Sequence, residues 1–354
     1  MTRTALLAAL VAFAACACEQ QKASEPAPTV KDKPAEPPKQ EVQLAPAPPV
    51  PEPPLGLPTV QSPKDNPQTP EKVYLGKQLF FDKRLSKDGS ASCETCHLHE
   101  KGWTDGLALS TKVGGAVNTR HTPTLYNVAF LREWYWDGRA PTLEKQIEAA
   151  WKGQMGADPA TVAGAIDKVP EYHARFQQVF GAGASASNVP MALAAYVRTL
   201  LAGGSAWDRY EKGDKNAVSE DAIKGYEVFT KKAQCSLCHV PPLYTDTLYH
   251  NVGIGTDKPK PDEGRGAITK DPKDKGAFKT PTLRQAAKTA PYFHDGSVAS
   301  LDEAVKFMLA GGKKNPNLDP KLKPQKLNDK ELKQLMAFLS ALESQDELEK
   351  PPLP

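Results

Sequence analysis

Two Cys-x-x-Cys-His motifs constrain this chain of 354 residues more than any other feature. They are Cys93-Glu94-Thr95-Cys96-His97 and Cys235-Ser236-Leu237-Cys238-His239. In such a motif the two thiols attach a porphyrin through thioether bonds, and the histidine coordinates the iron on one face. We therefore predict two covalently bound haem c groups, held by Cys93, Cys96 and His97 and by Cys235, Cys238 and His239. A zinc site needs four converging ligands and a thioredoxin-like dithiol needs no histidine, so both alternatives fit less well.

The charge of the chain argues against nucleic acid as a partner. The formal net charge is +3, with 45 lysine and arginine residues against 42 aspartate and glutamate residues. A nucleic-acid-binding domain normally carries a marked basic surface. Small molecules and redox proteins fit this composition better.

The N-terminus predicts export from the cytoplasm. In residues 1–18 a basic start is followed by an apolar run over residues 5–15, which is too short to span a bilayer and is typical of a signal peptide. The stretch Phe13-Ala14-Ala15-Cys16 resembles a lipobox, in which the cysteine becomes the lipidated first residue; ordinary cleavage near Ala17 is the alternative. Because haem c is attached outside the bacterial cytoplasm, we predict a periplasmic protein tethered to a membrane through lipidated Cys16.

Residues 19–70 have the composition of a spacer. They hold 15 of the 33 prolines of the chain, interleaved with alanine, lysine and glutamate. Such a segment buries too little apolar surface to fold alone. We predict a disordered linker over residues 19–70, without chemistry of its own.

A short pattern precedes each haem motif. Gly76-Lys77-Gln78-Leu79-Phe80 and Gly225-Tyr226-Glu227-Val228-Phe229 share the form Gly-x-x-x-aromatic. Glycine allows two helices to cross closely, and apolar helices at 191–201 and 332–342 are the expected crossing partners. Helical periodicity dominates and alternating strand patterns are nearly absent. We predict an all-α fold with two domains that resemble class I cytochrome c, at residues 71–212 and 213–354.

Four further motifs carry a resemblance that covers residues 71 to about 345. They are Leu75-Gly76-Lys77-Gln78-Leu79-Phe80-Phe81-Asp82, Arg120-His121-Thr122-Pro123-Thr124-Leu125, Trp136-Asp137-Gly138-Arg139-Ala140 and Pro291-Tyr292-Phe293-His294-Asp295-Gly296. In this order they resemble the bacterial di-haem cytochrome c peroxidase and MauG family. The resemblance implies a periplasmic oxidoreductase that uses two haems.

The resemblance implies different roles for the two haems. In the peroxidases a methionine caps the C-terminal haem, and Met308, fourteen residues beyond His294, occupies that position; MauG-like members have tyrosine there. A thioether ligand favours ferrous iron, which suits the electron-accepting haem. Core packing of Met308 on its helix is the alternative. The N-terminal haem on His97 is then the peroxidatic one, and the facing loop, residues 105–120, contains no histidine that would block it.

The resemblance also suggests the other site residues. Gln154 aligns with the distal glutamate of the peroxidases, although an amide cannot move a proton by ionising. Trp136 corresponds to a tryptophan between the two haems, and packing at a domain interface is its alternative role. Arg139 and Arg284 resemble residues that pair with haem propionates.

The family also implies an inter-domain calcium ion. The carbonyl groups of Thr289 and Pro291 match two expected ligands, but His121 stands where the peroxidases have asparagine. Calcium prefers oxygen ligands, so imidazole argues against it, and a structural hydrogen bond is the alternative role for His121.

We predict a di-haem cytochrome c peroxidase that reduces hydrogen peroxide to water with electrons from a small c-type cytochrome or cupredoxin. Electrons enter at the His239/Met308 haem and peroxide is reduced at the His97 haem. One alternative is a MauG-like enzyme that oxidises aromatic residues of a partner protein, and another is a non-catalytic di-haem electron carrier. Family peroxidases are often homodimers.

Overall fold

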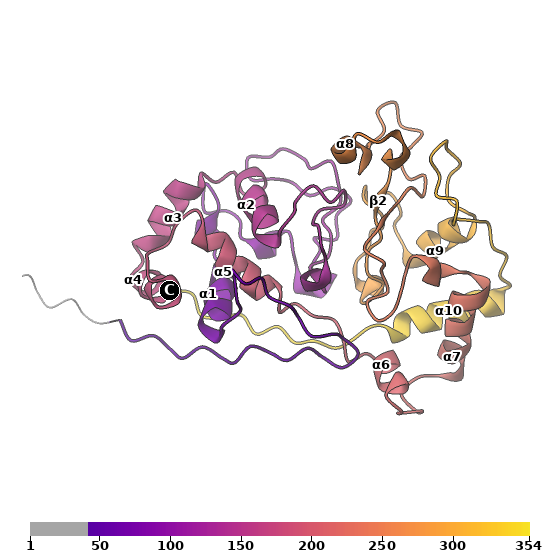
Figure 1. The fold of residues 1–354 in the computed structure, drawn as a ribbon, viewed down its shortest axis with the longest axis horizontal. Coiled ribbons are helices and arrows are strands. Elements are labelled where there is room, and N and C mark those ends of the chain that lie inside the picture. Colours follow the sequence, from indigo (N-terminus) through magenta and orange to yellow (C-terminus); the bar gives the residue numbers. More distant parts are fainter. Residues whose placement is uncertain (1–41) are drawn as a thin grey trace, which may run out of the picture. The chain divides into compact units, whose positions relative to one another are not determined.

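The structure, a computed structural model, describes residues 42–354 (Figure 1). The predicted signal peptide, Cys16 and the first part of the linker lie outside the described residues. The fold is helix-rich, as predicted, with a single two-stranded antiparallel pair, β1 (Tyr249–His250) and β2 (Phe278–Lys279). The α-helices are α1 (Pro70–Phe81), α2 (Leu143–Gly153), α3 (Pro159–Asp167), α4 (Pro170–Phe180), α5 (Asn188–Val197), α6 (Ala206–Glu211), α7 (Glu220–Glu227), α8 (Gly266–Thr269), α9 (Leu301–Leu309) and α10 (Asp329–Ala341). None of the helices in residues 42–354 is long and apolar enough to cross a membrane.

The buried apolar side chains form two clusters. The first gathers residues between 73 and 202 from α1 to α5, with Phe80 and Tyr172 at its centre. The second gathers residues between 207 and 342, with Phe229 and Phe338 at its centre. Trp207 of α6 packs in the second cluster, although it precedes the domain boundary predicted at 212/213.

Each cluster is built around a helix crossing at a glycine. A Cβ atom on Gly76 of α1 would lie 1.9 Å from the carbonyl oxygen of Ala192 in α5. A Cβ atom on Gly225 of α7 would lie 1.9 Å from the carbonyl oxygen of Gln334 in α10. Only glycine permits so close an approach of two backbones. The crossing partners predicted from the Gly-x-x-x-aromatic pattern are therefore confirmed.

Residues 42–69 are ordered against the first cluster, so the predicted disorder of residues 19–70 is wrong for this part. Val50 packs on the cluster, and the carbonyl group of Leu55 accepts a hydrogen bond from the Gly204 amide. The amides of Asn66 and Gln68 donate to the carbonyl groups of Met191 and Ala195 in α5. Proline-rich backbone lacks donors, yet its carbonyl groups and its few amide side chains bind a neighbouring surface without forming a core of their own.

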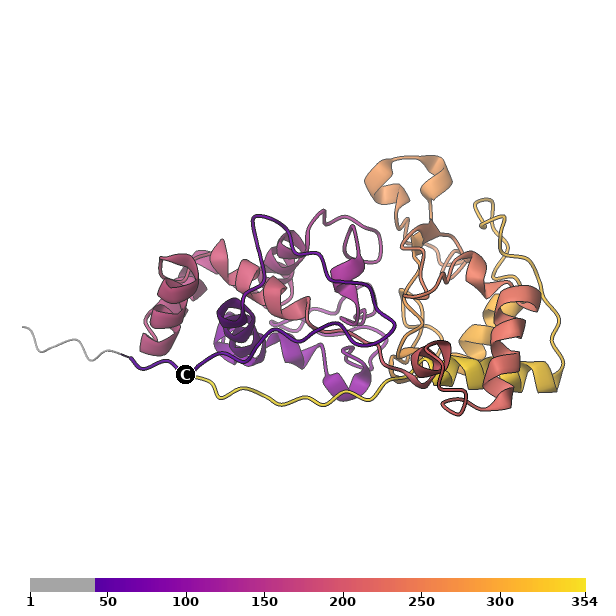
Figure 2. The ribbon, with the colours of Figure 1, turned by 60° about the horizontal axis from the view of Figure 1, so that its bottom comes forward.

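The C-terminal tail also lies against the N-terminal half. After α10 the chain runs extended past α1, as both views of the ribbon show (Figures 1 and 2). Gln78 donates to the carbonyl oxygen of Pro352, and Tyr126 donates to Asp346 at 2.6 Å. Two extended segments therefore complete the surface of the first cluster.

Replacement of Gly225 by alanine should destabilise the second cluster. The new methyl group meets a backbone carbonyl rather than a flexible side chain, so we expect a loss of about 2–3 kcal/mol of unfolding free energy. Urea denaturation followed by circular dichroism measures this loss. The control is Gly164→Ala in α3, where a Cβ atom meets nothing within 4 Å; it should stabilise by about 0.5–1 kcal/mol. Equal stability of the two variants would contradict the close crossing.

Candidate functional site

One cavity of about 680 Å³ is lined by both Cys-x-x-Cys-His motifs. Cys93, Cys96, Cys235 and Cys238 are unpaired thiols in its wall. Burial raises the pKa of the Cys93 and Cys235 thiols to about 12. Cys93 and Cys235 therefore face the cavity as neutral thiols, and none of the four cysteines forms a disulfide.

The two motif histidines have the same orientation. His97 Nδ1 lies 2.8 Å from the carbonyl oxygen of Trp103, and His239 Nδ1 lies 2.9 Å from that of Tyr244. Because a carbonyl oxygen only accepts, each Nδ1 carries the proton and each Nε2 keeps a free lone pair. Burial lowers the pKa of both imidazoles, which keeps them neutral. A neutral imidazole with its other nitrogen hydrogen-bonded to a carbonyl is the usual state of a metal-ligating histidine.

The backbone conformation of Trp103 and Tyr244 sets the direction of these carbonyl groups, and two threonines hold that conformation. Trp103 and Tyr244 have left-handed backbones, with φ of 61° and 53°, which non-glycine residues rarely adopt. The preceding carbonyl groups, of Gly102 and Leu243, accept hydrogen bonds of 2.6 Å from the hydroxyl groups of Thr124 and Thr282. Sequence reasoning missed both threonines. The signal is the repeat Thr-Pro-Thr-Leu, at residues 122–125 and again at 280–283.

The repeat brings the two halves together through paired backbone hydrogen bonds. In the first half His121 directly precedes the repeat and Trp136 follows it, and Lys279 and His294 stand at the same two spacings in the second half. The His121 amide donates to the His294 carbonyl oxygen, and the Lys279 amide donates to the Trp136 carbonyl oxygen, both at 2.8 Å. These are equivalent bonds exchanged between the halves. All four side chains line the cavity.

Met308 faces the same cavity as His239. It lies near the end of α9, whose cavity face also contains Leu301, Val305 and Leu309. These three neighbours pack against the second apolar cluster, whereas Met308 does not belong to it. Met308 is thus a cavity residue that lies outside the second apolar cluster.

Gln154 also lines the cavity, and it is the C-terminal cap residue of α2. Its backbone is fixed by hydrogen bonds from its own amide to Ala150 and from the Val113 amide to its carbonyl oxygen. The side-chain oxygen Oε1 is buried and has no hydrogen-bond partner among the described residues. An unsatisfied buried acceptor is costly unless a bound molecule donates to it.

Of the two arginines predicted to pair with haem propionates, one is used elsewhere. Arg284 is 1% exposed and forms a bidentate pair with Asp208 of α6 at 2.7 Å, while its Nε donates to Pro242. It does not line the cavity, and its guanidinium hydrogen bonds are made to Asp208 and Pro242 instead. Arg139 does line the cavity; it pairs with Asp137 at 3.0 Å and stacks on Tyr135.

Lys279 is a cavity residue that the sequence did not single out. It is buried, and burial lowers the pKa of its ammonium group to about 8. Its Nζ donates to the carbonyl oxygen of Glu133. A buried lysine places a positive charge in the wall of the cavity that both motifs line.

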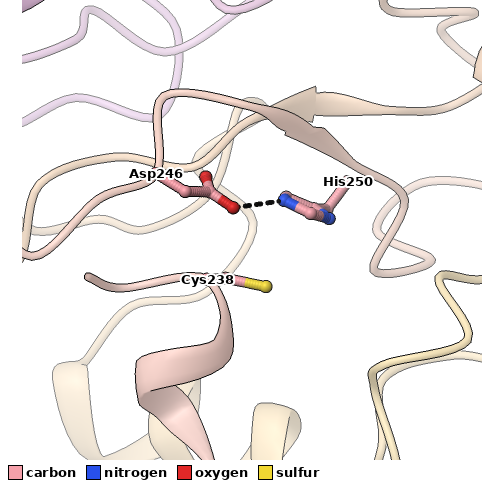
Figure 3. A group of neighbouring side chains, drawn as sticks. All are labelled: Cys238, Asp246 and His250. Atoms are coloured by element: carbon pink, nitrogen blue, oxygen red, sulfur yellow. Dashed lines mark hydrogen bonds and ion pairs between the residues drawn. The ribbon is translucent and has the colours of Figure 1, made fainter.

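Cys238, Asp246 and His250 come close together beside the second motif (Figure 3). His250 Nε2 contacts Asp246 at 2.9 Å, and its Nδ1 contacts Asp319 at 2.5 Å. Contact with Cys238, and then with the two carboxylates, raises the pKa of His250 to about 10. A thioether bond at Cys238 removes its thiolate, so this group does not fit a further metal ion in a haem-loaded chain.

The surroundings of His121 fit calcium poorly. Its Nδ1 lies 2.7 Å from the carbonyl oxygen of Leu107, and the backbone of Thr289 also acts on the imidazole. Burial lowers the pKa of this side chain. A neutral imidazole thus occupies the space between carbonyl groups where the predicted ion would need oxygen ligands.

Comparison with known proteins identifies the family. The family model for di-haem cytochrome c peroxidase matches residues 70–216. The chain is 39% identical to the cytochrome-c peroxidase IdrP1 of Denitromonas iodatirespirans, over 82% of this chain and 86% of that protein. It belongs to the di-haem cytochrome c peroxidase family. It is equally 39% identical to the methylamine utilization protein MauG of Methylorubrum extorquens, over 81% of this chain and 82% of that protein.

Solved structures agree with this assignment. A MauG-like protein associated with microbial copper homeostasis is 30% identical, with a TM-score of 0.77 over 81% of this chain and 93% of its own. The di-haem peroxidase BthA of Burkholderia thailandensis shares the fold, at 20% identity and a TM-score of 0.63, over 85% of this chain and 95% of its own. The protein is therefore an enzyme of the peroxidase family, and the family implies haem cofactors. The oriented imidazoles, unpaired cysteines and apolar cavity fit two such groups.

Asp208→Asn should destabilise the fold without loss of haem. The variant leaves the buried Arg284 guanidinium without a counter-charge, which costs about 3–5 kcal/mol. Urea unfolding of the haem-loaded protein measures the loss, and the visible spectrum gives the haem content. Asp302→Asn, which removes an exposed pair with Lys306, is the control and should cost less than about 0.5 kcal/mol. Haem loss at unchanged stability would restore a propionate role for Arg284.

Proposed function

We propose that this protein is a di-haem cytochrome c peroxidase that reduces hydrogen peroxide to two water molecules, with two electrons and two protons per turnover. The electrons come one at a time from a small redox protein, a c-type cytochrome or a cupredoxin. The protein acts in the periplasm and is held at a membrane through lipidated Cys16. Each half of the folded chain binds one haem c, through Cys93, Cys96 and His97 and through Cys235, Cys238 and His239.

The position of Met308 is the observation that carries the proposal. When bound, the two haems supply the electron transfer and the peroxide chemistry. His239 and Met308 both line the cavity and would together hold the iron of the C-terminal haem, which would leave no place there for peroxide. His97 serves as the single protein ligand of the N-terminal site. The exposure of Met308 to the cavity, outside the apolar cluster, supports this division.

Gln154 binds peroxide in the N-terminal site under this proposal. Its unsatisfied Oε1 accepts a hydrogen bond from the peroxide, which is a donor at both oxygens. The amide orients the substrate but carries no ionisable proton, so water must move the proton from one oxygen to the other. The rate of this enzyme is then limited by the missing carboxylate.

Trp136 connects the two sites. Its indole Nε1 donates to the His121 carbonyl oxygen at 2.9 Å, and its own carbonyl accepts from Lys279. These bonds hold the ring in the wall of the shared cavity, and we assign it the passage of electrons between the sites. Arg139 lines the cavity, and its ion pair with Asp137 leaves its side chain partly exposed. In this scheme it binds a propionate group.

A MauG-like oxidation of aromatic residues in a partner protein is the second candidate. The chain is as similar to a MauG as to a peroxidase, and Gln154 replaces a carboxylate. One experiment separates the two: spectra of the oxidised and half-reduced protein with and without peroxide, followed by an assay with reduced cytochrome c. Rapid catalytic oxidation of the cytochrome supports the peroxidase. A persistent peroxide-oxidised spectrum without donor turnover supports the MauG-like function, and no response to peroxide refutes both.

Met308→Leu should lower the midpoint potential of the C-terminal haem and slow turnover with reduced cytochrome c on the order of tenfold, because the ligand that favours ferrous iron is lost. Spectroelectrochemical titration measures the potential. Met336→Leu, in the second cluster on α10, is the matched control and should change neither quantity. An unchanged potential in Met308→Leu would show that this residue is not a ligand.

Gln154→Glu should accelerate peroxide reduction, by about tenfold or more, because a carboxylate shuttles the proton that an amide only binds. The rate should also gain a pH dependence that reports the new carboxyl group. Gln146→Glu is the control, since Gln146 lines the same cavity. Stopped-flow mixing with peroxide gives the rates. Equal rates for the wild type and Gln154→Glu would remove Gln154 from the reaction.

A further inference from the structure

A lysine-rich segment lies in the loop between α9 and α10 (yellow in Figure 1). Residues 314–326 contain four lysines and one acidic residue, Asp319. All four lysines are exposed and none forms an ion pair with a described carboxylate: Lys314, Lys321, Lys323 and Lys326. Unpaired lysines on one short loop create a local positive potential.

This loop runs beside the second haem motif. The Asp319 amide donates to the Asn251 carbonyl oxygen at 2.9 Å, next to β1. The Gln325 side chain contacts that of Gln234, the residue before Cys235, at 3.4 Å. Lys321 and Lys323 line the mouth of the cavity that also contains His239 and Met308. The lysines therefore border the C-terminal site.

The second haem motif and the residue after it carry two exposed apolar side chains. Leu237 lies between the two cysteines and is 47% exposed, and Val240 follows His239 and is 43% exposed. A single exposed leucine needs no explanation, but apolar residues surrounded by charges have the composition of a protein–protein contact surface. The apolar residues contribute close packing and the charged rim contributes orientation and association rate.

The carboxylates at this surface do not neutralise the lysines. Asp246 and Asp319 both contact His250, one on each ring nitrogen, and a single imidazole can offset at most one of these two negative charges. Glu331, at the start of α10, is bound to Lys232. The four unpaired lysines outnumber the carboxylates that remain, so the net charge at the border of the C-terminal site is positive.

We propose that this surface, formed by Leu237, Val240, Lys321, Lys323 and Lys326, is the docking site for an acidic redox protein. The partner presents an apolar patch around its redox centre, surrounded by aspartate and glutamate. Each encounter transfers one electron from the reduced partner, so two partner molecules are oxidised for each peroxide reduced to two water molecules. The inference rests on the proposed peroxidase function, because it names the donor class for the same C-terminal site.

Two forms of one donor test the charge of the partner. Mitochondrial cytochrome c is basic in its native form and acidic after succinylation of its lysines, with the same haem in both. Stopped-flow oxidation of each reduced form by the haem-loaded full chain and peroxide gives second-order rate constants. The acidic form should react about tenfold faster at low ionic strength, and the difference should vanish in high salt. A faster reaction of the basic form would overturn the proposal.

The triple variant K321E/K323E/K326E should reverse this preference. The control K64E/K83E/K168E makes the same change in charge at exposed lysines in the N-terminal half and should leave the preference intact. Carbodiimide coupling of wild type with the acidic cytochrome should cross-link Lys321 and Lys323, detected by mass spectrometry. Equal effects of both triple variants, or cross-links distributed over the whole surface, would refute a defined docking site.

Two further measurements distinguish failure of the docking site from failure of the proposed peroxidase function. Turnover of peroxide with hydroquinone, a neutral small donor, should be the same in wild type and in K321E/K323E/K326E. Loss of turnover with every donor would refute the peroxidase function, whereas hydroquinone turnover with no charge preference would refute only the docking site. A third result would assign the lysines to a lipid surface: the wild type binds vesicles that contain phosphatidylglycerol, the triple variant does not, and the wild type oxidises both forms of cytochrome c equally fast. That result would overturn the proposal.

Discussion

Each motif histidine depends on one backbone carbonyl group for its orientation. The carbonyl groups of Trp103 and Tyr244 accept the Nδ1 protons of His97 and His239, so both Nε2 atoms are free to ligate. The left-handed backbone of the two aromatic residues aims these carbonyl groups, and the threonine hydroxyl groups next to them hold that backbone. If either loop relaxed to an ordinary backbone conformation, the imidazole would lose its partner and with it the fixed tautomer.

The sequence predicted those features that depend on local spacing. Glycine followed by an aromatic residue four positions later identified the helix crossings, because no other residue allows such an approach at Gly76 and Gly225. Features that depend on a distant partner could not be predicted in the same way. The counter-charge of Arg284 is Asp208, which lies 76 positions away and on a different element. A resemblance in the local motif gave no sign of it.

Composition misjudged residues 42–69 for a related reason. A count of prolines measures how little a segment can bond to itself, whereas these residues bond to α5 and to the loop after it. Asn66 is 1% exposed even though it lies in a proline-rich stretch. The capacity of a segment to order therefore depends on the acceptors and donors that another part of the chain leaves open.

The paired backbone bonds between the halves have the form of a two-fold contact. In a symmetric homodimer, residue i of one subunit contacts residue j of the other, and j contacts i. Here His121 bonds to His294, and Lys279, the counterpart of His121, bonds to Trp136, the counterpart of His294. The chain thus contains the geometry of an isologous interface inside one polypeptide. The equivalent positions carry different side chains, histidine and lysine at 121 and 279 and tryptophan and histidine at 136 and 294, so the same backbone contact presents two chemically different environments to the cavity.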